Sequence, residues 1–212
     1  MYSMLSVSGQ TMSRWLRIIA TGGLLALAGC ANEAVQVQRI AVDEVRDLSG
    51  NWNDTDSRLV SNEMVEDMLS RSWLQNHMEE FAQEPTVIVG SISNLSREHI
   101  NTQTFINDIE RELINSGQIA FVANRNERMD IREERLDQDM NASAHSRKAM
   151  GQELGADYML LGSINTLIDA AGKVQVTYYQ VDLKLISLTD NRTHWVGQKK
   201  IKKLITGDLS RY

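Results

Sequence analysis

The sequence predicts a domain of the α/β or α+β class, in which helices flank a mixed β-sheet. Three observations support this. Short β-branched segments alternate with segments of helical periodicity in the first part of the chain. From residue 173 onward the pattern changes to long strands of alternating polarity. The chain has 212 residues, of which 42% are hydrophobic and 24% charged, which is enough for one globular domain.

The first helical region is expected from Asp54 to about Phe81. Apolar residues recur through it at helical spacing, and Asp54 offers an N-cap with further acid in the first turn. Pro85 stops the helix, because proline lacks the backbone N–H that a helix needs. The β-branched run 86–92 follows directly and predicts a buried strand.

A second helix is expected to begin at Thr102, with its apolar residues on one stripe. Gly117 is suited to the left-handed conformation that commonly ends a helix, so the helix should close there. The apolar runs 119–122 and 156–164 predict two further strands.

Two more helices are expected between these strands. Asn124, with Glu127 three residues later, indicates a capped helix to about Leu136. Its charges alternate in sign, which is typical of a solvated, ion-paired face. Residues 137–143 predict a polar loop, and residues 144–154 predict another helix.

The C-terminal part is expected to be an antiparallel hairpin. Apolar residues up to Tyr178 lie on one parity of the strand, whereas those from Tyr179 onward lie on the other. One strand cannot face both ways without an extra residue, so the sequence predicts a β-bulge near these two tyrosines. Residues 189–192 have turn chemistry, and the last strand is expected from about 193 to 203.

The first thirty residues have the pattern of a secretory signal. Arg14 and Arg17 are the only charges in them, and the apolar stretch 18–28 is too short to span a bilayer. The stretch ends in Leu27-Ala28-Gly29-Cys30, which resembles a bacterial lipobox. The alternative is a core helix with a buried cysteine, since free cysteine is often buried.

We therefore expect residues 1–29 to be a lipoprotein signal peptide and Cys30 to be the acylated mature N-terminus. Because the next residue is Ala31 rather than aspartate, the lipobox resemblance implies an outer-membrane lipid anchor on the periplasmic face. Residues 30–47 are polar and are expected to be a short tether, at most about 63 Å when fully extended. Residues 48–212 are then a single globular domain.

The sequence lacks the motifs that usually carry chemistry. It has no GxxxxGK[ST], GxGxxG or GxSxG motif, and its histidines stand at no recognised metal spacing. One cysteine excludes an internal disulfide and a CxxC site, and a net charge of −6 disfavours nucleic-acid binding. We expect a protein that is not an enzyme and that has no cofactor, metal or small-molecule substrate.

Two groups of residues remain as candidate contacts. One is a cluster of four lysines in an acidic protein, which could contact an anionic surface or acidic partner, or could simply keep an edge strand from pairing. The other is a set of aromatic residues near the hairpin, which could anchor a partner or could pack beneath the helices. The lysines are Lys199, Lys200, Lys202 and Lys203, and the aromatic residues are Tyr178, Tyr179 and Trp195.

Three segments carry a family resemblance: 47–56 with the helix that follows it, 86–94 with its helix and the run 116–122, and 154–162. Together with the lipobox, they make the chain similar to the penicillin-binding protein activator LpoB family over roughly residues 30 to 203. The Gly-Ala-Asp-Tyr step in the last segment is shared with related lipoproteins, including curli-secretion proteins. The resemblance implies a fold similar to the N-terminal domain of TolB.

The resemblance also implies a regulator of peptidoglycan synthesis. Such lipoproteins activate a class A bifunctional penicillin-binding protein by binding an accessory domain of it. Well-studied members cross the cell wall with a long proline-rich linker, whereas the tether here is short and has no proline. Two alternatives therefore stay open: a structural or assembly lipoprotein of the envelope (curli-secretion-like or another scaffold) without a synthase partner, and an enzyme acting on the wall.

Overall fold

The computed structural model describes residues 36–143, 145–146 and 153–207 of the chain. It divides into two units, Met1–Glu44 and Val45–Tyr212. In the first unit, the Glu44 N–H donates to the Ala41 carbonyl at 3.2 Å. The expected signal peptide 1–29 and Cys30 lie outside the described residues. In the described part of the chain, no helix has the length and apolar character that crossing a membrane requires.

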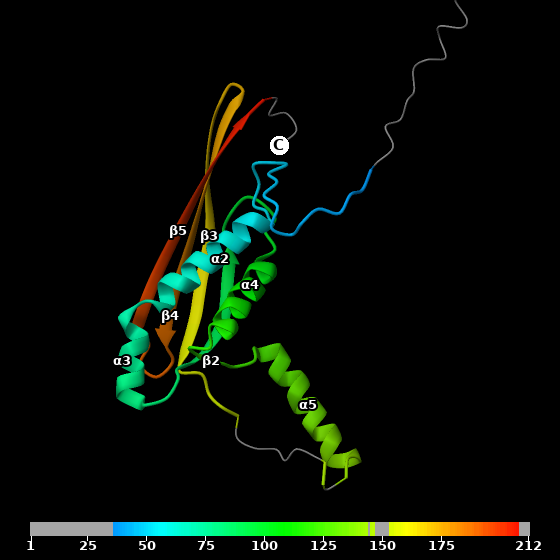
Figure 1. Cartoon of the computed structure of the whole chain (residues 1–212), viewed down its shortest axis with the longest axis vertical. Helices are drawn as coiled ribbons and strands as arrows, with labels where there is room; N and C mark the ends of the chain where they lie inside the picture. The colour runs from blue at the N-terminus through cyan, green and yellow to red at the C-terminus, as the bar shows by residue number, and fades with distance from the viewer. Residues whose placement is uncertain (1–35, 144, 147–152, 208–212) are drawn as a thin grey trace, which may run out of the picture. The chain divides into compact units, whose positions relative to one another are not determined.

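The second unit is built on one five-stranded sheet in the order β2-β1-β3-β4-β5 (Figure 1). β1 runs parallel to β2 and to β3, whereas β3, β4 and β5 are successively antiparallel. The mixed sheet predicted from the sequence is therefore confirmed. The strands are β1 (Thr86–Asn94), β2 (Ala120–Phe121), β3 (Tyr158–Ala171), β4 (Val174–Ser187) and β5 (Thr193–Thr206).

Helices cover one face of this sheet, which makes the fold α+β. α2 packs against α4 and β5, and α4 packs against β1 and β2 (Figure 1). α5 contributes no buried residue, as expected for a solvated helix. The helices of the described residues are α2 (Asp54–Leu69), α3 (Ser72–Phe81), α4 (Thr102–Ser116) and α5 (Arg125–Asn141).

The expected single helix up to Phe81 is in fact two helices, and that prediction is wrong. α2 ends at Leu69 because local side chains take over its last carbonyl groups. The Ser70 hydroxyl donates to the Asp67 carbonyl at 2.8 Å, and the indole N–H of Trp73 donates to the Met68 carbonyl at 2.7 Å. The start also differs by one residue, because Asn53 caps α2.

The other helix ends follow their chemistry more closely. Gly117 caps α4 with φ of 63°, as predicted. Asn124 and Glu127 form the predicted capping box of α5. α5 nevertheless continues to Asn141, so the polar loop expected at 137–143 is mostly helical. The expected helix at 144–154 lies mainly outside the described residues, although residues 153–156 are described and are not helical.

The predicted β-bulge at Tyr178 and Tyr179 is also wrong. The register of β4 with β3 and with β5 runs unbroken through both tyrosines, and the only shift lies between Leu185 and Ile186 opposite β5. Odd-numbered residues of β4 from Thr177 onward are buried beneath the helices. The change of parity in the sequence therefore reflects apolar side chains on the other face of the sheet.

Leu113 in α4 provides a direct test of the core, because its side chain is completely buried. Leu113→Ala should lower the free energy of unfolding by about 2–5 kcal/mol, since it leaves a cavity. The neighbouring Ile114 is 52% exposed on the same helix, so Ile114→Ala should cost less than about 1 kcal/mol. Urea unfolding of both variants measures the difference. Equal losses would contradict the packing of α4 described above.

Candidate partner-binding surface

One face of the sheet has no helix packed on it among the described residues. Because side chains alternate along a strand, this open face receives the even-numbered residues of β4 and β5 and the odd-numbered residues of β3. Tyr178 lies on it, directly between Leu167 of β3 and Lys202 of β5. Leu167 is 68% exposed, and exposed apolar side chains that stand together, unlike single ones, often mark an interaction site.

The same pattern continues on both sides of Tyr178. Val176 lies between Asp169 and the exposed Leu204, and Lys200 lies opposite Gln180. We name the resulting group the Tyr178 patch. It combines an aromatic ring, aliphatic side chains and two lysines, and tyrosine is among the residues that most often anchor protein interfaces. Its members are Leu167, Val176, Tyr178, Lys200, Lys202 and Leu204.

Sequence reasoning missed the three aliphatic members of this patch. The sequence does contain a feature that indicates them, namely Gly172 and Lys173, which form the two-residue turn between β3 and β4. A two-residue turn fixes the register of a hairpin. That register places Leu167 opposite Tyr178 and would have brought them together from the sequence alone.

The four candidate lysines divide between the two faces of the sheet. Lys199 and Lys203 lie on the helix-covered face and are engaged in ion pairs with acidic residues of this chain. Lys200 and Lys202 are exposed on the open face, and no described residue forms an ion pair with them. The four-lysine anionic contact stays a prediction, and in this structure Lys199 and Lys203 are already paired with acidic residues of the chain.

The three candidate aromatic residues divide in the same way. Tyr179 and Trp195 are buried beneath the helices, at 0% and 5% exposure. The prediction that they form a partner interface is wrong, since both side chains are buried. Tyr178 alone lies on the open face, where its hydroxyl is 3.3 Å from the side-chain oxygen of Gln180.

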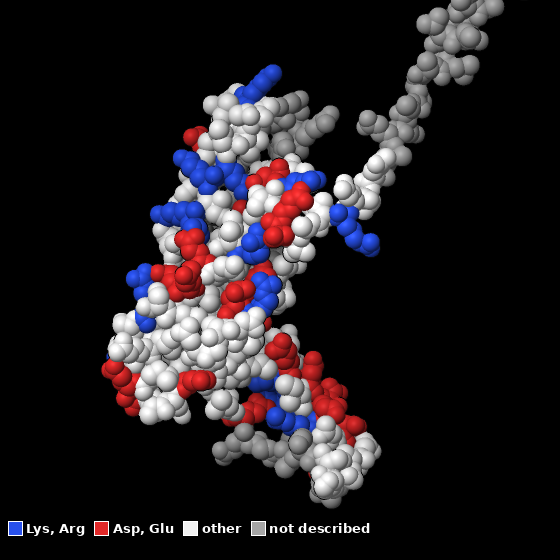
Figure 2. All heavy atoms as spheres, in the orientation of Figure 1, with Lys and Arg blue, Asp and Glu red and all other residues white. Residues whose placement is uncertain are grey.

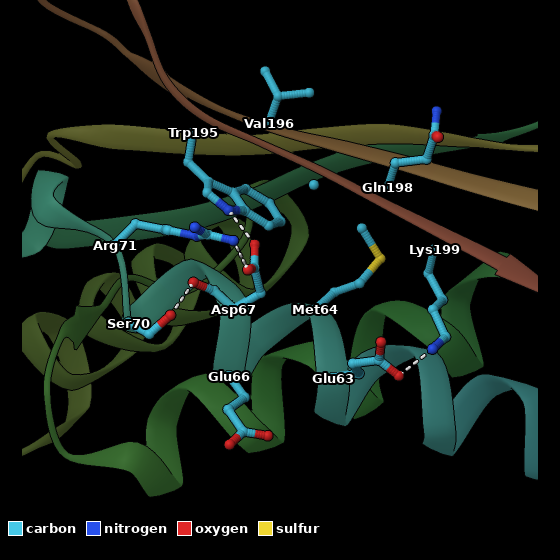
Figure 3. A pocket seen from close by; sticks show the side chains of 11 residues that line it. Glu63, Met64, Glu66, Asp67, Ser70, Arg71, Trp195, Val196, Gln198 and Lys199 are labelled. Carbon is cyan, nitrogen blue, oxygen red and sulfur yellow. Dashed lines mark hydrogen bonds and ion pairs between the residues drawn. The ribbon is translucent and has the colours of Figure 1, made fainter.

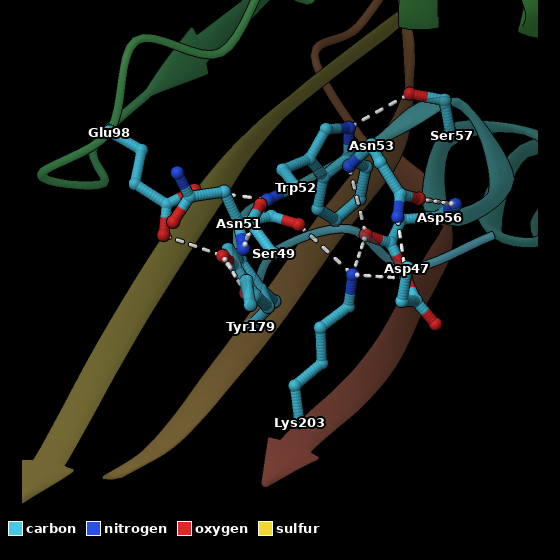
Figure 4. A network of polar contacts seen from close by, with 11 residues as sticks. Asp47, Ser49, Asn51, Trp52, Asn53, Asp56, Ser57, Glu98, Tyr179 and Lys203 are labelled. Atoms are coloured by element: carbon cyan, nitrogen blue, oxygen red, sulfur yellow. Dashed lines mark hydrogen bonds and ion pairs between the residues drawn. The ribbon is translucent and has the colours of Figure 1, made fainter. Parts of the chain in front are cut away.

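Residues 47–53, which we name the strap, are fixed against β5 by Lys203 (Figure 4). The Lys203 ammonium lies 2.7 Å from the Asp56 carboxylate and 3.2 Å from that of Asp47, and it donates to the Asn51 carbonyl at 3.0 Å. The Lys203 side chain is only 12% exposed. The Asp47 pKa is lowered, first by the hydrogen bond from the Asn53 amide and then by Lys203.

Tyr179 holds the strap from the other side (Figure 4). Its hydroxyl lies 3.0 Å from the Gly50 carbonyl oxygen and 2.5 Å from the Glu98 carboxylate, which also accepts the Trp52 N–H at 3.0 Å. The Trp52 ring packs edge-on against both Tyr179 and Phe105. Burial, followed by the Glu98 hydrogen bond and charge, raises the pKa of the Tyr179 phenol.

A hollow of about 520 Å³ lies between α2 and β5 (Figure 3). Asp67 stands in it, bonded to the Arg71 guanidinium and to the Trp195 indole N–H at 2.8 Å. The hydrogen bond from Arg71 is the main cause of the lowered Asp67 pKa. Glu63 pairs with Lys199 at the other end of the hollow. These charges neutralise one another, so the hollow is polar but not strongly charged.

The described residues offer little for catalysis or metal binding. No group of three or more His, Cys, Asp or Glu residues among them could hold a metal ion. His77 is buried with its Nδ1 atom 2.9 Å from the Tyr158 hydroxyl, and it packs beside Phe81 in a structural setting. The face with α2 and α4 in front carries acidic and basic side chains intermixed (Figure 2).

One family model matches more than half of the chain. The family model described as the peptidoglycan-synthase activator LpoB matches residues 56–201. Among solved structures, the chain is similar to the LpoB C-terminal domain from Salmonella enterica, with 13% identity over 70% of this chain and 99% of that chain and a TM-score of 0.40. The corresponding Escherichia coli domain gives 15% identity, the same coverage and a TM-score of 0.41.

A third similar structure is the lipoprotein GNA1162 from Neisseria meningitidis. It is 15% identical over 57% of this chain and 83% of that chain, with a TM-score of 0.36. No curated protein sequence matched the chain significantly.

The hydrogen bonds of the Tyr179 hydroxyl to the strap and to Glu98 should contribute measurably to stability. Tyr179→Phe should destabilise the fold by about 1–3 kcal/mol at pH 7, because the Gly50 carbonyl and Glu98 carboxylate lose a buried donor. The raised pKa keeps the phenol protonated in the folded state, whereas the unfolded chain ionises near pH 10. The stability that this phenol contributes is thus complete below about pH 10 and declines above it.

Urea unfolding at pH 7 and at about pH 11 measures both effects. The difference in free energy of unfolding between the wild-type chain and Tyr179→Phe should be smaller at the higher pH. Tyr178→Phe is the matched control, since its hydroxyl is on the open face and its removal should cost less than about 0.5 kcal/mol at either pH. A difference that is independent of pH would contradict the buried, protonated phenol.

Proposed function

This chain belongs to the LpoB family of peptidoglycan-synthase activators, and from this premise we propose that it is a non-catalytic lipoprotein that activates a class A bifunctional penicillin-binding protein. The observation that carries the proposal is the family match over residues 56–201, which spans α2 to α5 and all but the end of β5. The regulator acts by binding, so it needs an exposed contact surface on a stable body.

The Tyr178 patch is the surface that we assign to this contact. Its side chains are exposed or half-exposed on the open face of the sheet. They stand on three paired strands, so their positions are set before a partner arrives. Lys200 and Lys202 give the patch a positive charge in a protein whose net charge is −6. Such a patch favours an acidic partner surface with an apolar centre.

We further propose that Cys30 anchors the protein in the outer membrane and that the domain faces the periplasm. Three acyl chains, which the lipobox resemblance implies, would hold the protein durably, since a single chain gives only marginal binding. The tether from Cys30 to Asp47 is 18 residues long and reaches at most about 63 Å. The bound synthase must therefore extend its accessory domain close to the outer membrane.

The same short tether favours one alternative, an assembly or structural lipoprotein whose partner lies in the outer membrane itself. A pull-down with acylated protein from detergent-solubilised envelopes distinguishes the two. Recovery of a class A penicillin-binding protein supports the activator, whereas recovery of outer-membrane components without a synthase supports the alternative.

The anchor is tested by changing its cysteine. Mass spectrometry of the purified wild-type protein should show a chain that begins at Cys30 and carries three acyl groups. Cys30→Ser should leave the chain unacylated and without its membrane anchor, because serine offers no thiol for acylation. A Cys30→Ser protein that is still processed and anchored would refute the assignment.

The patch is tested by measuring synthase binding and stimulation. Tyr178→Ala and Lys202→Glu should each weaken binding by roughly 1–4 kcal/mol with little change in the free energy of unfolding, because both side chains lie outside the core. Lys173→Glu at the exposed β3–β4 turn is a control of equal charge change and should bind normally. If all three well-folded variants stimulate the synthase equally, the patch is not the contact.

A further inference from the structure

The outer edge of β5 is free among the described residues. β5 is the last strand of the sheet and pairs only with β4, although it is 14 residues long. Its pairing with β4 is regular from Trp195 to Thr206, and the only register shift lies before this stretch. Proteins usually shorten, bend or cover such an edge, because its unpaired backbone groups can accept another strand.

The backbone groups at this edge can be assigned by residue. The Gly207 N–H donates to the Lys173 carbonyl at 2.9 Å, which makes these two residues a hydrogen-bonded pair. In an antiparallel ladder the bonded pairs alternate, so the odd-numbered residues of β5 bond to β4. The N–H and C=O groups of the even-numbered residues, among them Gln198, Lys200 and Lys202, therefore point away from the sheet.

Hollows along β5 leave room beside this edge. The hollow of about 520 Å³ between α2 and β5 includes residues 195–199 in its wall (Figure 3). A second hollow of about 440 Å³, between the strap and β5, includes residues 202–206. A strand added to β5 would direct alternate side chains toward these hollows and the others toward the open face.

The charge of β5 selects among possible occupants. Because β5 contains no acidic residue, a second copy of it would bring no carboxylate to Lys200 or Lys202, and paired antiparallel about Ile201 it would place Lys200 opposite Lys202 of the second copy. Like charges directly opposite each other destabilise a strand pair. An extended segment with acidic residues would instead place carboxylates beside Lys200 and Lys202, which no described residue pairs. Charge complementarity thus favours an acidic partner segment over a second copy.

We propose that β5 binds an extended, acidic segment of the partner protein as a sixth strand of the sheet. The inference rests on the proposed function for the identity of that partner, the class A synthase. The backbone groups of Gln198, Lys200 and Lys202 supply the hydrogen bonds, and the two lysines select acidic residues at alternate positions of the segment. This is the β-augmentation mode of peptide recognition.

Amide hydrogen exchange tests the edge directly, with a synthetic peptide of alternating glutamate and valine as the probe and the full chain as the protein. The peptide should slow exchange of the Gln198, Lys200 and Lys202 amides by about tenfold or more, because each gains a backbone hydrogen bond. A peptide of alternating lysine and valine should not. Unchanged exchange at these amides, or equal effects of both peptides, would overturn the proposal.

A proline substitution separates strand addition from a contact made only by side chains. Gln198→Pro removes an outward N–H that β4 does not use, so an edge strand should tolerate it. Gln198→Ala is the control, since both variants lose the side-chain bond to Asp182. With the purified synthase, the proline variant should bind about tenfold more weakly than the alanine variant, a difference of about 1.4 kcal/mol.

Unfolding by urea checks that the proline variant is folded. Equal synthase binding by two folded variants would overturn strand addition. If the wild-type chain binds the glutamate peptide with protected amides but does not bind the synthase, the proposed function is wrong while the edge site stands.

Discussion

The ion pair between Lys203 and Asp56 is the interaction on which the arrangement of this domain depends. A charge buried without a partner costs several kcal/mol, so Lys203 requires the acceptors that surround it. Asp56 also accepts the Asn53 N–H at 3.0 Å, and its own N–H donates to the Asn53 side chain. The same carboxylate thus caps α2, pairs with a lysine of β5 and hydrogen-bonds to the strap, so it ties these three segments together on the face where α2 buries its apolar residues.

Because α2 covers only one face of the sheet, the side chains on the two faces of the hairpin have different surroundings. On the covered face, Lys203 and Tyr179 form ion pairs or hydrogen bonds with other residues of the chain. On the open face, residues of the same types one position along the strand remain exposed, as Lys202 and Tyr178 show. Adjacent residues of one strand therefore lie in completely different surroundings, because the period of a strand is two residues.

Local chemistry made part of this fold predictable from the sequence. The capping box at Asn124 and the left-handed cap at Gly117 were identified because each depends on a few neighbouring residues. The break at Ser70 was missed because it rests on hydrogen bonds from the Ser70 and Trp73 side chains to backbone carbonyls, which the apolar spacing of the helix does not indicate. The pairing of Lys203 was missed because its partner Asp56 lies almost 150 residues away in the sequence. The candidate site was predicted least well, because deciding which residues lie on the open face required the register of β4 with its neighbouring strands.

The patch and the edge are two aspects of one constraint on the partner. In β5, the residues whose side chains lie on the open face are also those whose backbone groups point outward. A strand that bonds to the backbone of Lys200 and Lys202 must therefore lay its own alternate side chains beside these lysines, with Lys202 between them and Tyr178. In the proposed mode, Lys200 and Lys202 would disfavour pairing with a second copy of the same edge and favour an acidic segment. The geometry thus couples recognition of charge to recognition of an extended backbone.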